Sequence, residues 1–153
     1  MRIWLVPLIE LSDQHILGQH REWHMLHAML NNSRFATHPL VLFYKGKKPW
    51  LRDFHHKLLR EMNVRYQHNI EAHLTPVPEG YETGCSFWPI DAMWIQYDRV
   101  DLAQRYMQRP NFFKWTNRVK PKWVRESNIK LGPIPAYQFA KPEVYGQLRS
   151  TLT

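Results

Sequence analysis

The sequence predicts a mainly α-helical fold: a compact single domain of about three main helices with long ordered loops. Apolar residues recur at helical spacing in three separate stretches. Residues that favour helix ends stand beside these stretches, among them Ser12, Pro49 and Asp98. The chain of 153 residues, 44% of them hydrophobic, is long enough for one domain with a real core but not for two.

The first helix is expected to begin after Ser12 and to run to about Leu30. Ser12 is a favourable N-cap, Asp13 suits the positive end of the helix dipole, and Asn31-Asn32-Ser33 stops the run of good helix formers. Glu22 then lies in the middle of this helix. On a period of about 3.6 residues it shares a mostly apolar face with Leu11, His15, Gly18, Leu26 and Met29.

A carboxylate on such a face needs a partner, and two interpretations of Glu22 remain open. In the first, it forms an ion pair with Arg21 or another basic residue. In the second, it is a general acid/base whose partner is the α-amine of Met1. An α-amine has a pKa of ~7.7 to 8, against ~10.4 for lysine, so it is nucleophilic at neutral pH without special burial.

The remaining elements follow from spacing and from helix-breaking residues. Residues 31–38 form a polar turn, and residues 40–44 fit a strand or a buried helical turn equally. Pro49 marks the start of a second main helix, expected to bury Leu51, Phe54, Leu58, Leu59 and Met62 and to expose Arg52, Asp53, His56, Lys57, Arg60 and Glu61. Residues 63–89 predict a long ordered loop. A third main helix, capped by Asp98, is expected to run to about Met107, to bury Val100, Ala103 and Met107, and to end at Gln108-Arg109-Pro110.

Charge and cysteine content indicate the kind of partner and the compartment. The net charge is +8 and the isoelectric point is near 9.8, which favours an anionic partner. Nucleic acid is the commonest such partner, and an acidic membrane surface or plain solubility are the alternatives. Cys85 is the single cysteine, so no intramolecular disulfide is possible and a reducing cytoplasm is expected. The apolar run from Ile3 to Ile9 is too short for a signal peptide or a membrane span.

A mixed aromatic and basic segment comprises Phe112, Phe113, Lys114 and Trp115, with Arg118, Lys120 and Lys122 after it. It suits a protein that holds distorted DNA, because stacking a base on an aromatic ring contributes ~1 to 3 kcal/mol. In the alternative interpretation, which fits the sequence equally well, the aromatic rings belong to the core and the lysines are simply solvated. At least one of these aromatic rings is expected to be inside.

The nine histidines raise the question of a metal site. His20, His24 and His27 share the face opposite Glu22, and i, i+4 spacing can chelate zinc. The string His20-Arg21-Glu22-Trp23-His24 is not the H-E-x-x-H of zinc proteases, since its Glu points away from both His side chains. No metal site is predicted, and His55 and His56 are expected at the surface or facing DNA. Serine hydrolase, NTPase and dehydrogenase fingerprints are absent from the sequence.

The order Glu10-Leu11-Ser12-Asp13-Gln14-His15, followed by Arg21-Glu22, resembles the pyrimidine dimer DNA glycosylases of the phage T4 endonuclease V type. The resemblance extends over about residues 1–120, since it recurs at Phe43-Tyr44, at Glu61-Met62 and in the stretch from Leu102 to Trp115. In that family the N-terminal amine attacks C1′ of a deoxyribose and a helical Glu handles the protons. The resemblance implies that Met1 and Glu22 are catalytic and that Arg2, Gln14 and Arg21 contact DNA. His15 shares the Glu22 face, where it is expected to contact a phosphate or to orient the site, and a structural histidine is the alternative. The DNA contacts predicted for the aromatic and basic segment rest on its composition, as given above.

The function predicted is therefore that of a DNA repair N-glycosylase with AP-lyase activity, acting on UV-type pyrimidine dimers in duplex DNA. The partner is damaged double-stranded DNA; no metal, organic cofactor, membrane or obligate protein partner is expected, and the chain is expected to be a monomer in the cytoplasm. Residues 121–153 are expected to form a Pro-containing extension packed on the same domain. Two alternatives stay open: a glycosylase of the same scaffold for another damaged or modified base, and a non-catalytic basic nucleic-acid-binding module.

Overall fold

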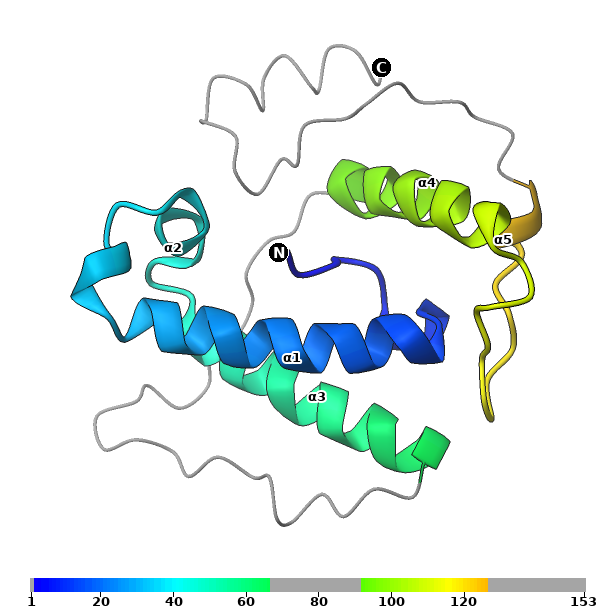
Figure 1. Ribbon diagram of the computed structural model, residues 1–153, viewed down its shortest axis with the longest axis horizontal. Helices are drawn as coiled ribbons and strands as arrows, with labels where there is room; N and C mark the ends of the chain where they lie inside the picture. The colour runs from blue at the N-terminus through cyan, green and yellow to red at the C-terminus, as the bar shows by residue number, and fades with distance from the viewer. Residues whose placement is uncertain (1, 67–91, 127–153) are drawn as a thin grey trace.

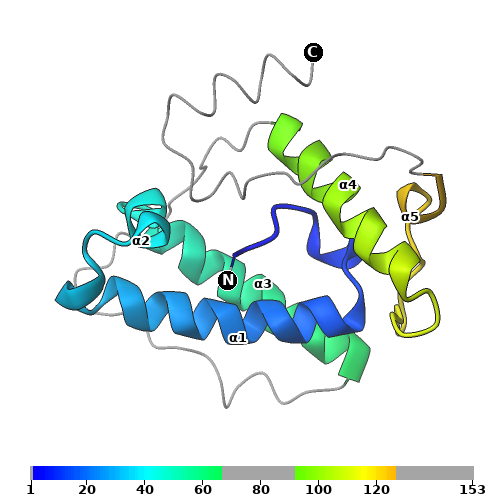
Figure 2. The ribbon, with the colours of Figure 1, turned by 45° about the horizontal axis from the view of Figure 1, so that its top comes forward.

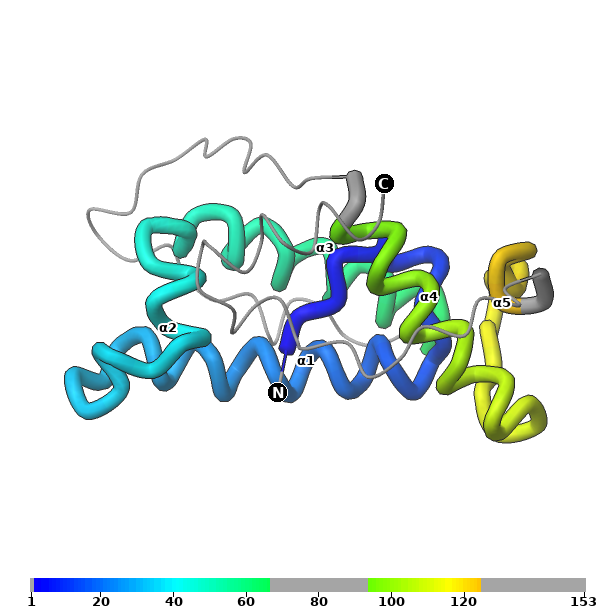
Figure 3. The backbone as a smooth tube through the Cα atoms, turned by 90° about the horizontal axis from the view of Figure 1, so that it is seen from above, coloured from blue at the N-terminus to red at the C-terminus, as the bar shows by residue number. Residues whose placement is uncertain are grey.

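The computed structural model describes residues 2–66 and 92–126, and this part of the chain is mainly helical and has no strand. Three long helices dominate it: α1 (Asp13–Leu30), α3 (Lys48–Tyr66) and α4 (Ala92–Gln108) (Figure 1). Two short helices, α2 (Pro39–Tyr44) and α5 (Trp123–Glu126), lie at opposite ends of the molecule (Figure 3). Single 3-10 turns cover Leu8–Glu10 and Ser33–Phe35. The predicted mainly α fold is confirmed.

Helix α1 has the predicted bounds. The Ser12 hydroxyl oxygen accepts a hydrogen bond from the backbone N–H of His15 at 3.2 Å, as an N-cap should. At the other end, the backbone N–H of Asn31 donates to the carbonyl of His27 at 3.3 Å and closes the last turn. Local chemistry therefore sets both ends of this helix.

Helix α3 packs against α1 and buries all five predicted apolar residues. The indole N–H of Trp23 on α1 donates to the carbonyl of Leu51 at 2.7 Å and ties the two helices together. The run Leu40 to Tyr44, for which a strand and a helical turn fitted equally, is the helix α2. The prediction that a loop begins at Asn63 is wrong, because α3 continues to Tyr66. The reason is the buried side chain of Arg65, whose contacts hold the last turn.

Helix α4 begins at Ala92, so the prediction that Asp98 caps it is wrong. Asp98 is buried inside the helix and bonds to the N-terminal segment instead. Val100 and Ala103 are buried as predicted, and the helix ends at Gln108 as predicted. Met107 is 44% exposed, contrary to prediction, because the turn after Ala103 presents Tyr106 to the core.

The N-terminal segment, residues 2–6, runs between α1 and α4 (Figures 1 and 2). Residues 3–6 are buried, and the segment joins the hydrophobic core with side chains from α1 to α5. Cys85, most of the predicted loop 63–89 and most of the predicted extension 121–153 lie outside the described residues. In the described ranges, no helix combines the length and apolar character needed to cross a membrane.

Candidate active site

The carboxylate of Glu22 lies against the start of the chain. Glu22 is half-buried in the middle of α1, and its Oε2 accepts a hydrogen bond from the backbone N–H of Arg2 at 2.8 Å. The apolar face predicted for Glu22 is confirmed, since Leu11, Leu26 and Met29 are buried. Met1, the predicted nucleophile, lies outside the described residues. The catalytic roles of Met1 and Glu22 stay predictions.

Side chains of α1 and α4 hold the rest of this segment. Gln19, one turn before Glu22 and only 1% exposed, accepts from the N–H of Trp4 at 2.7 Å and donates to the carbonyl of Arg2 at 3.1 Å. The carboxylate of Asp98 accepts from the N–H of Leu5 at 2.7 Å. These bonds satisfy buried backbone groups that a neighbouring strand would otherwise pair. Sequence reasoning missed Gln19, although a polar residue three positions before Glu22 on an apolar face was a signal.

The guanidinium of Arg2, a predicted DNA contact, has partners inside the protein. Its Nη2 lies 2.6 Å from Asp98 and 3.2 Å from Asp101, and its Cζ lies 3.7 Å from the ring centre of Trp4. The side chain is 12% exposed. Two carboxylates therefore offset its charge, and contact with a DNA phosphate would compete with them.

His15, another predicted DNA contact, packs among aromatic rings. It stacks on Phe113 with ring centres 5.3 Å apart and meets Trp4 and Tyr106 edge-on. Its Nδ1 lies 3.0 Å from the Ser12 hydroxyl. Burial, with a contribution from Arg105 and partial opposition from Asp101, lowers the pKa of His15 to about 4. The ring is therefore uncharged at neutral pH, which favours a positioning role over a charged phosphate contact.

The aromatic and basic segment is hydrogen-bonded to the first turn of α1. The Gln14 amide donates to the carbonyl of Phe112 at 2.8 Å and accepts from the N–H of Lys114 at 3.2 Å. Phe113 and Trp115 pack partly buried against the core, which confirms that at least one aromatic ring lies inside. Phe112 is 45% exposed, and Lys114 and Arg21 are also exposed. Of the predicted DNA contacts, these three present side chains to solvent.

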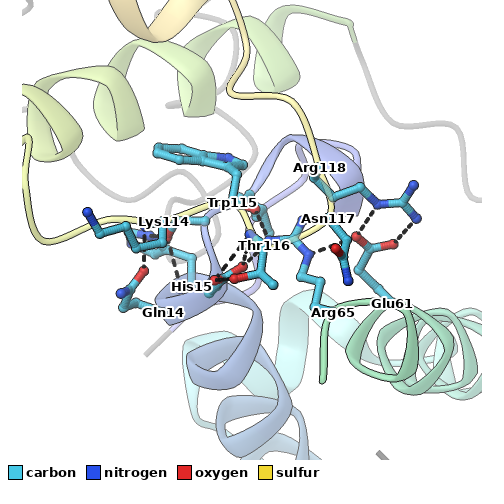
Figure 4. A network of polar contacts seen from close by, with 12 residues as sticks. Gln14, His15, Glu61, Arg65, Lys114, Trp115, Thr116, Asn117 and Arg118 are labelled. Atoms are coloured by element: carbon cyan, nitrogen blue, oxygen red, sulfur yellow. Dashed lines mark hydrogen bonds and ion pairs between the residues drawn. The ribbon is translucent and has the colours of Figure 1, made fainter. Parts of the chain in front are cut away.

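A buried ionic network joins this segment to α1 and α3 (Figure 4). The fully buried guanidinium of Arg65 binds Asp13 at 3.0 Å and Glu61 at 2.9 Å. Asp13 also accepts from the hydroxyl of Thr116 at 2.6 Å, and Glu61 from Arg118 at 2.8 Å. Burial opposes ionisation of Glu61, but hydrogen bonds from Arg118 and Arg65 outweigh it and lower its pKa. The prediction that Glu61 faces solvent is wrong, because these cations draw it inward.

Three histidines, two from α1 and one from α3, come together on the side of α1 opposite Glu22. His55 of α3 is 1% exposed, so its predicted surface position is wrong. It stacks on Trp23 with ring centres 3.9 Å apart and lies beside His20 and His24. Burial and, secondarily, the neighbouring histidines lower the pKa of His55 to about 3. Sequence spacing pointed to His20 and His24 but not to His55, which the packing of α3 brings to them.

Comparison with known proteins gives a family match to the first part of the chain. The family model of pyrimidine dimer DNA glycosylases matches residues 1–74, a range that includes Glu22, the N-terminal segment and helices α1 to α3. The later stretch of resemblance, from Leu102 to Trp115, lies beyond this match. No curated protein and no solved structure matches the chain. Residues 1–74 of the chain are therefore similar to the pyrimidine dimer DNA glycosylases.

Proposed function

We propose that this protein is a DNA N-glycosylase with AP-lyase activity that acts on UV-type pyrimidine dimers in duplex DNA through an imine at the Met1 amine. The observation that carries the proposal is the 2.8 Å hydrogen bond from the Arg2 N–H to Glu22. It places a carboxylate beside the first peptide bond of a chain whose first 74 residues match this glycosylase family.

Covalent geometry limits how far the reacting groups can be from one another. Three bonds separate the α-nitrogen of Met1 from the backbone nitrogen of Arg2, so these two atoms lie within about 4 Å in any conformation. Because Glu22 is hydrogen-bonded to that backbone nitrogen, its carboxylate is within reach of the amine directly or through one water.

The chemistry follows from these two groups. The amine lone pair forms a bond to C1′ while the bond from C1′ to the pyrimidine nitrogen breaks, and the departing base keeps that electron pair and takes a proton. Opening of the sugar ring, with a proton delivered to O4′, leaves a protonated imine. Removal of a proton from C2′ then breaks the C3′–O3′ bond and releases the phosphate, and water hydrolyses the imine. Glu22 accepts the amine proton, delivers a proton to O4′ as the ring opens and then takes the C2′ proton.

Charge near the amine decides when it can attack. A carboxylate favours the protonated, non-nucleophilic form of a neighbouring amine. Arg2 offers little relief, because Asp98 and Asp101 already offset its guanidinium. We therefore expect the rate of imine formation to rise as the pH passes through an amine pKa above the ~7.7 to 8 of an unperturbed α-amine.

The surface of the protein suits a DNA substrate. The net charge of +8 attracts the phosphate backbone, and the exposed Lys114, Arg21 and Phe112 are available to it. A lesion lowers the unpairing cost of flipping a nucleotide, which helps the amine to reach C1′.

Borohydride trapping tests the proposal, because it reduces the imine to a stable covalent adduct. Untagged protein is incubated with three duplexes that carry a cyclobutane pyrimidine dimer, an abasic site or no damage. Adducts on both lesions support the full proposal. An adduct on the abasic duplex alone would reassign the target base. If no adduct forms but the protein binds DNA tightly and with strong salt dependence, the enzyme proposal is refuted and the protein is a non-catalytic nucleic-acid-binding module.

Two variants locate the chemistry. Glu22→Gln keeps an acceptor for the Arg2 N–H but removes the base, so we expect turnover to fall by ~10² to 10⁴-fold while DNA binding persists. An N-terminal extension that blocks the amine should abolish the adduct, and the same extension placed after Thr153 should not. Retained activity in Glu22→Gln, or with the N-terminal extension, would contradict these roles.

A further inference from the structure

We propose that His20, His24 and His55 form a binding site for a divalent transition-metal ion, zinc by preference, that links α1 to α3 on the side away from Glu22. His20 and His24 are one turn apart on α1, and His55 comes from the facing turn of α3. One ligand nitrogen of each ring lies within 4.8 Å of the other two.

Two nitrogen separations and all three ring-centre distances are close to those of imidazoles on one tetrahedral ion. With zinc–nitrogen bonds of 2.0 to 2.1 Å, the nitrogens of two ligands are about 3.3 Å apart and their ring centres roughly 5 Å apart. The Nε2 of His20 lies 3.1 Å from that of His24 and 3.3 Å from that of His55. The three ring-centre distances are 4.6, 5.3 and 5.1 Å.

Hydrogen bonding among the rings accounts for this arrangement less well than a cation does. A ring nitrogen carries either one proton or one lone pair, so the Nε2 of His20 can form one well-directed hydrogen bond but not two. It nevertheless lies near the Nε2 atoms of both His24 and His55. A metal ion can accept a lone pair from each of the three nitrogens, which lie within 4.8 Å of one another.

The surroundings decide the kind of site. His55 is held in place by stacking on Trp23, whose indole bonds to Leu51, so one ligand is rigid. His24 is exposed and His20 half-buried, so water can reach the fourth coordination position. Imidazole ligands suit zinc, copper, nickel and iron rather than magnesium or calcium. An ion here would fasten α1 to α3 and thereby support the helix that carries Glu22.

Spectroscopic titration of the untagged, chelator-treated protein with Co²⁺ tests the site, because tetrahedral Co²⁺ gives intense visible bands. We expect one equivalent to bind, to produce these bands and to be displaced by Zn²⁺. His24→Ala should weaken binding by more than about tenfold. Its side chain is exposed, so this variant should fold. Zn²⁺ should raise the melting temperature of the wild type but not of His24→Ala.

His27→Ala is the matched control. His27 lies on the same helix, stacks on Trp23 and contacts Asn31, but it is not one of the three ligands. Its replacement should leave Co²⁺ affinity and the zinc-induced shift unchanged. Absence of tetrahedral bands in the wild type, or equal affinity in wild type and His24→Ala, would overturn the proposal.

Discussion

Replacing Gln19 should separate the placement of the N-terminal segment from the stability of the fold. Gln19→Ala removes the acceptor of the Trp4 N–H and the donor to the Arg2 carbonyl. Each buried backbone group left without a partner costs about 1 to 3 kcal/mol, so losing both partners should lower the free energy of unfolding by roughly 2 to 6 kcal/mol. If the segment also shifts by about 1 Å, imine formation should slow by ~10²-fold.

Two measurements separate these effects: urea denaturation, and single-turnover borohydride trapping on abasic DNA well below the melting temperature. Leu59→Ala serves as the control, because removing this buried side chain costs about 2 to 5 kcal/mol without touching the segment's hydrogen bonds. It should match Gln19→Ala in stability but trap at the wild-type rate. Equal trapping rates for Gln19→Ala and Leu59→Ala would refute the positioning role.

Other predictions concern the buried polar contacts. Arg65→Met should lower the free energy of unfolding by about 3 to 5 kcal/mol, because it leaves Asp13 without one cation; a loss under about 1 kcal/mol in urea denaturation would contradict this. Tyr106→Phe removes the hydroxyl that accepts from the Ser12 N–H at 3.0 Å and should cost about 1 to 3 kcal/mol, seen as a lower melting temperature. The pKa of His15 is lower in the folded protein than in the unfolded chain. The contribution of the uncharged ring to the free energy of unfolding is therefore complete above pH ~6.5 and is lost as the pH falls towards about 4. Urea denaturation between pH 7.5 and 4 should therefore show a shallower pH slope for His15→Gln than for the wild type, and equal slopes would count against it.

The parts of the fold that the sequence predicts well are those set by local chemistry. Ser12 and Asn31 bound α1 because capping acts within one turn, and the inward face of α3 follows from apolar spacing alone. Glu22 could be singled out for the same reason, since its face of α1 is defined by neighbours three and four residues away.

The parts that the sequence does not predict depend on contacts between distant residues. Asp98 looks like a helix cap, yet it sits inside α4 because Arg2 and Leu5, more than ninety residues earlier, bond to its carboxylate. Glu61 looks solvent-facing by periodicity, but Arg118 draws it inward. His55 is likewise placed by helix packing. In each case, a tertiary partner outweighs the local pattern.

The two sites proposed for α1 should act nearly independently, and the helix geometry says why. Glu22 lies two positions from both His20 and His24, and two positions turn the helix by about 200°. The metal ligands and the carboxylate therefore face opposite sides, and a bound ion can affect Glu22 only by moving the helix as a body. We expect the effects of His24→Ala and Glu22→Gln on trapping to be additive within about 0.5 kcal/mol in a double-mutant cycle. A larger coupling would show that the link between α1 and α3 helps to set the position of the catalytic carboxylate.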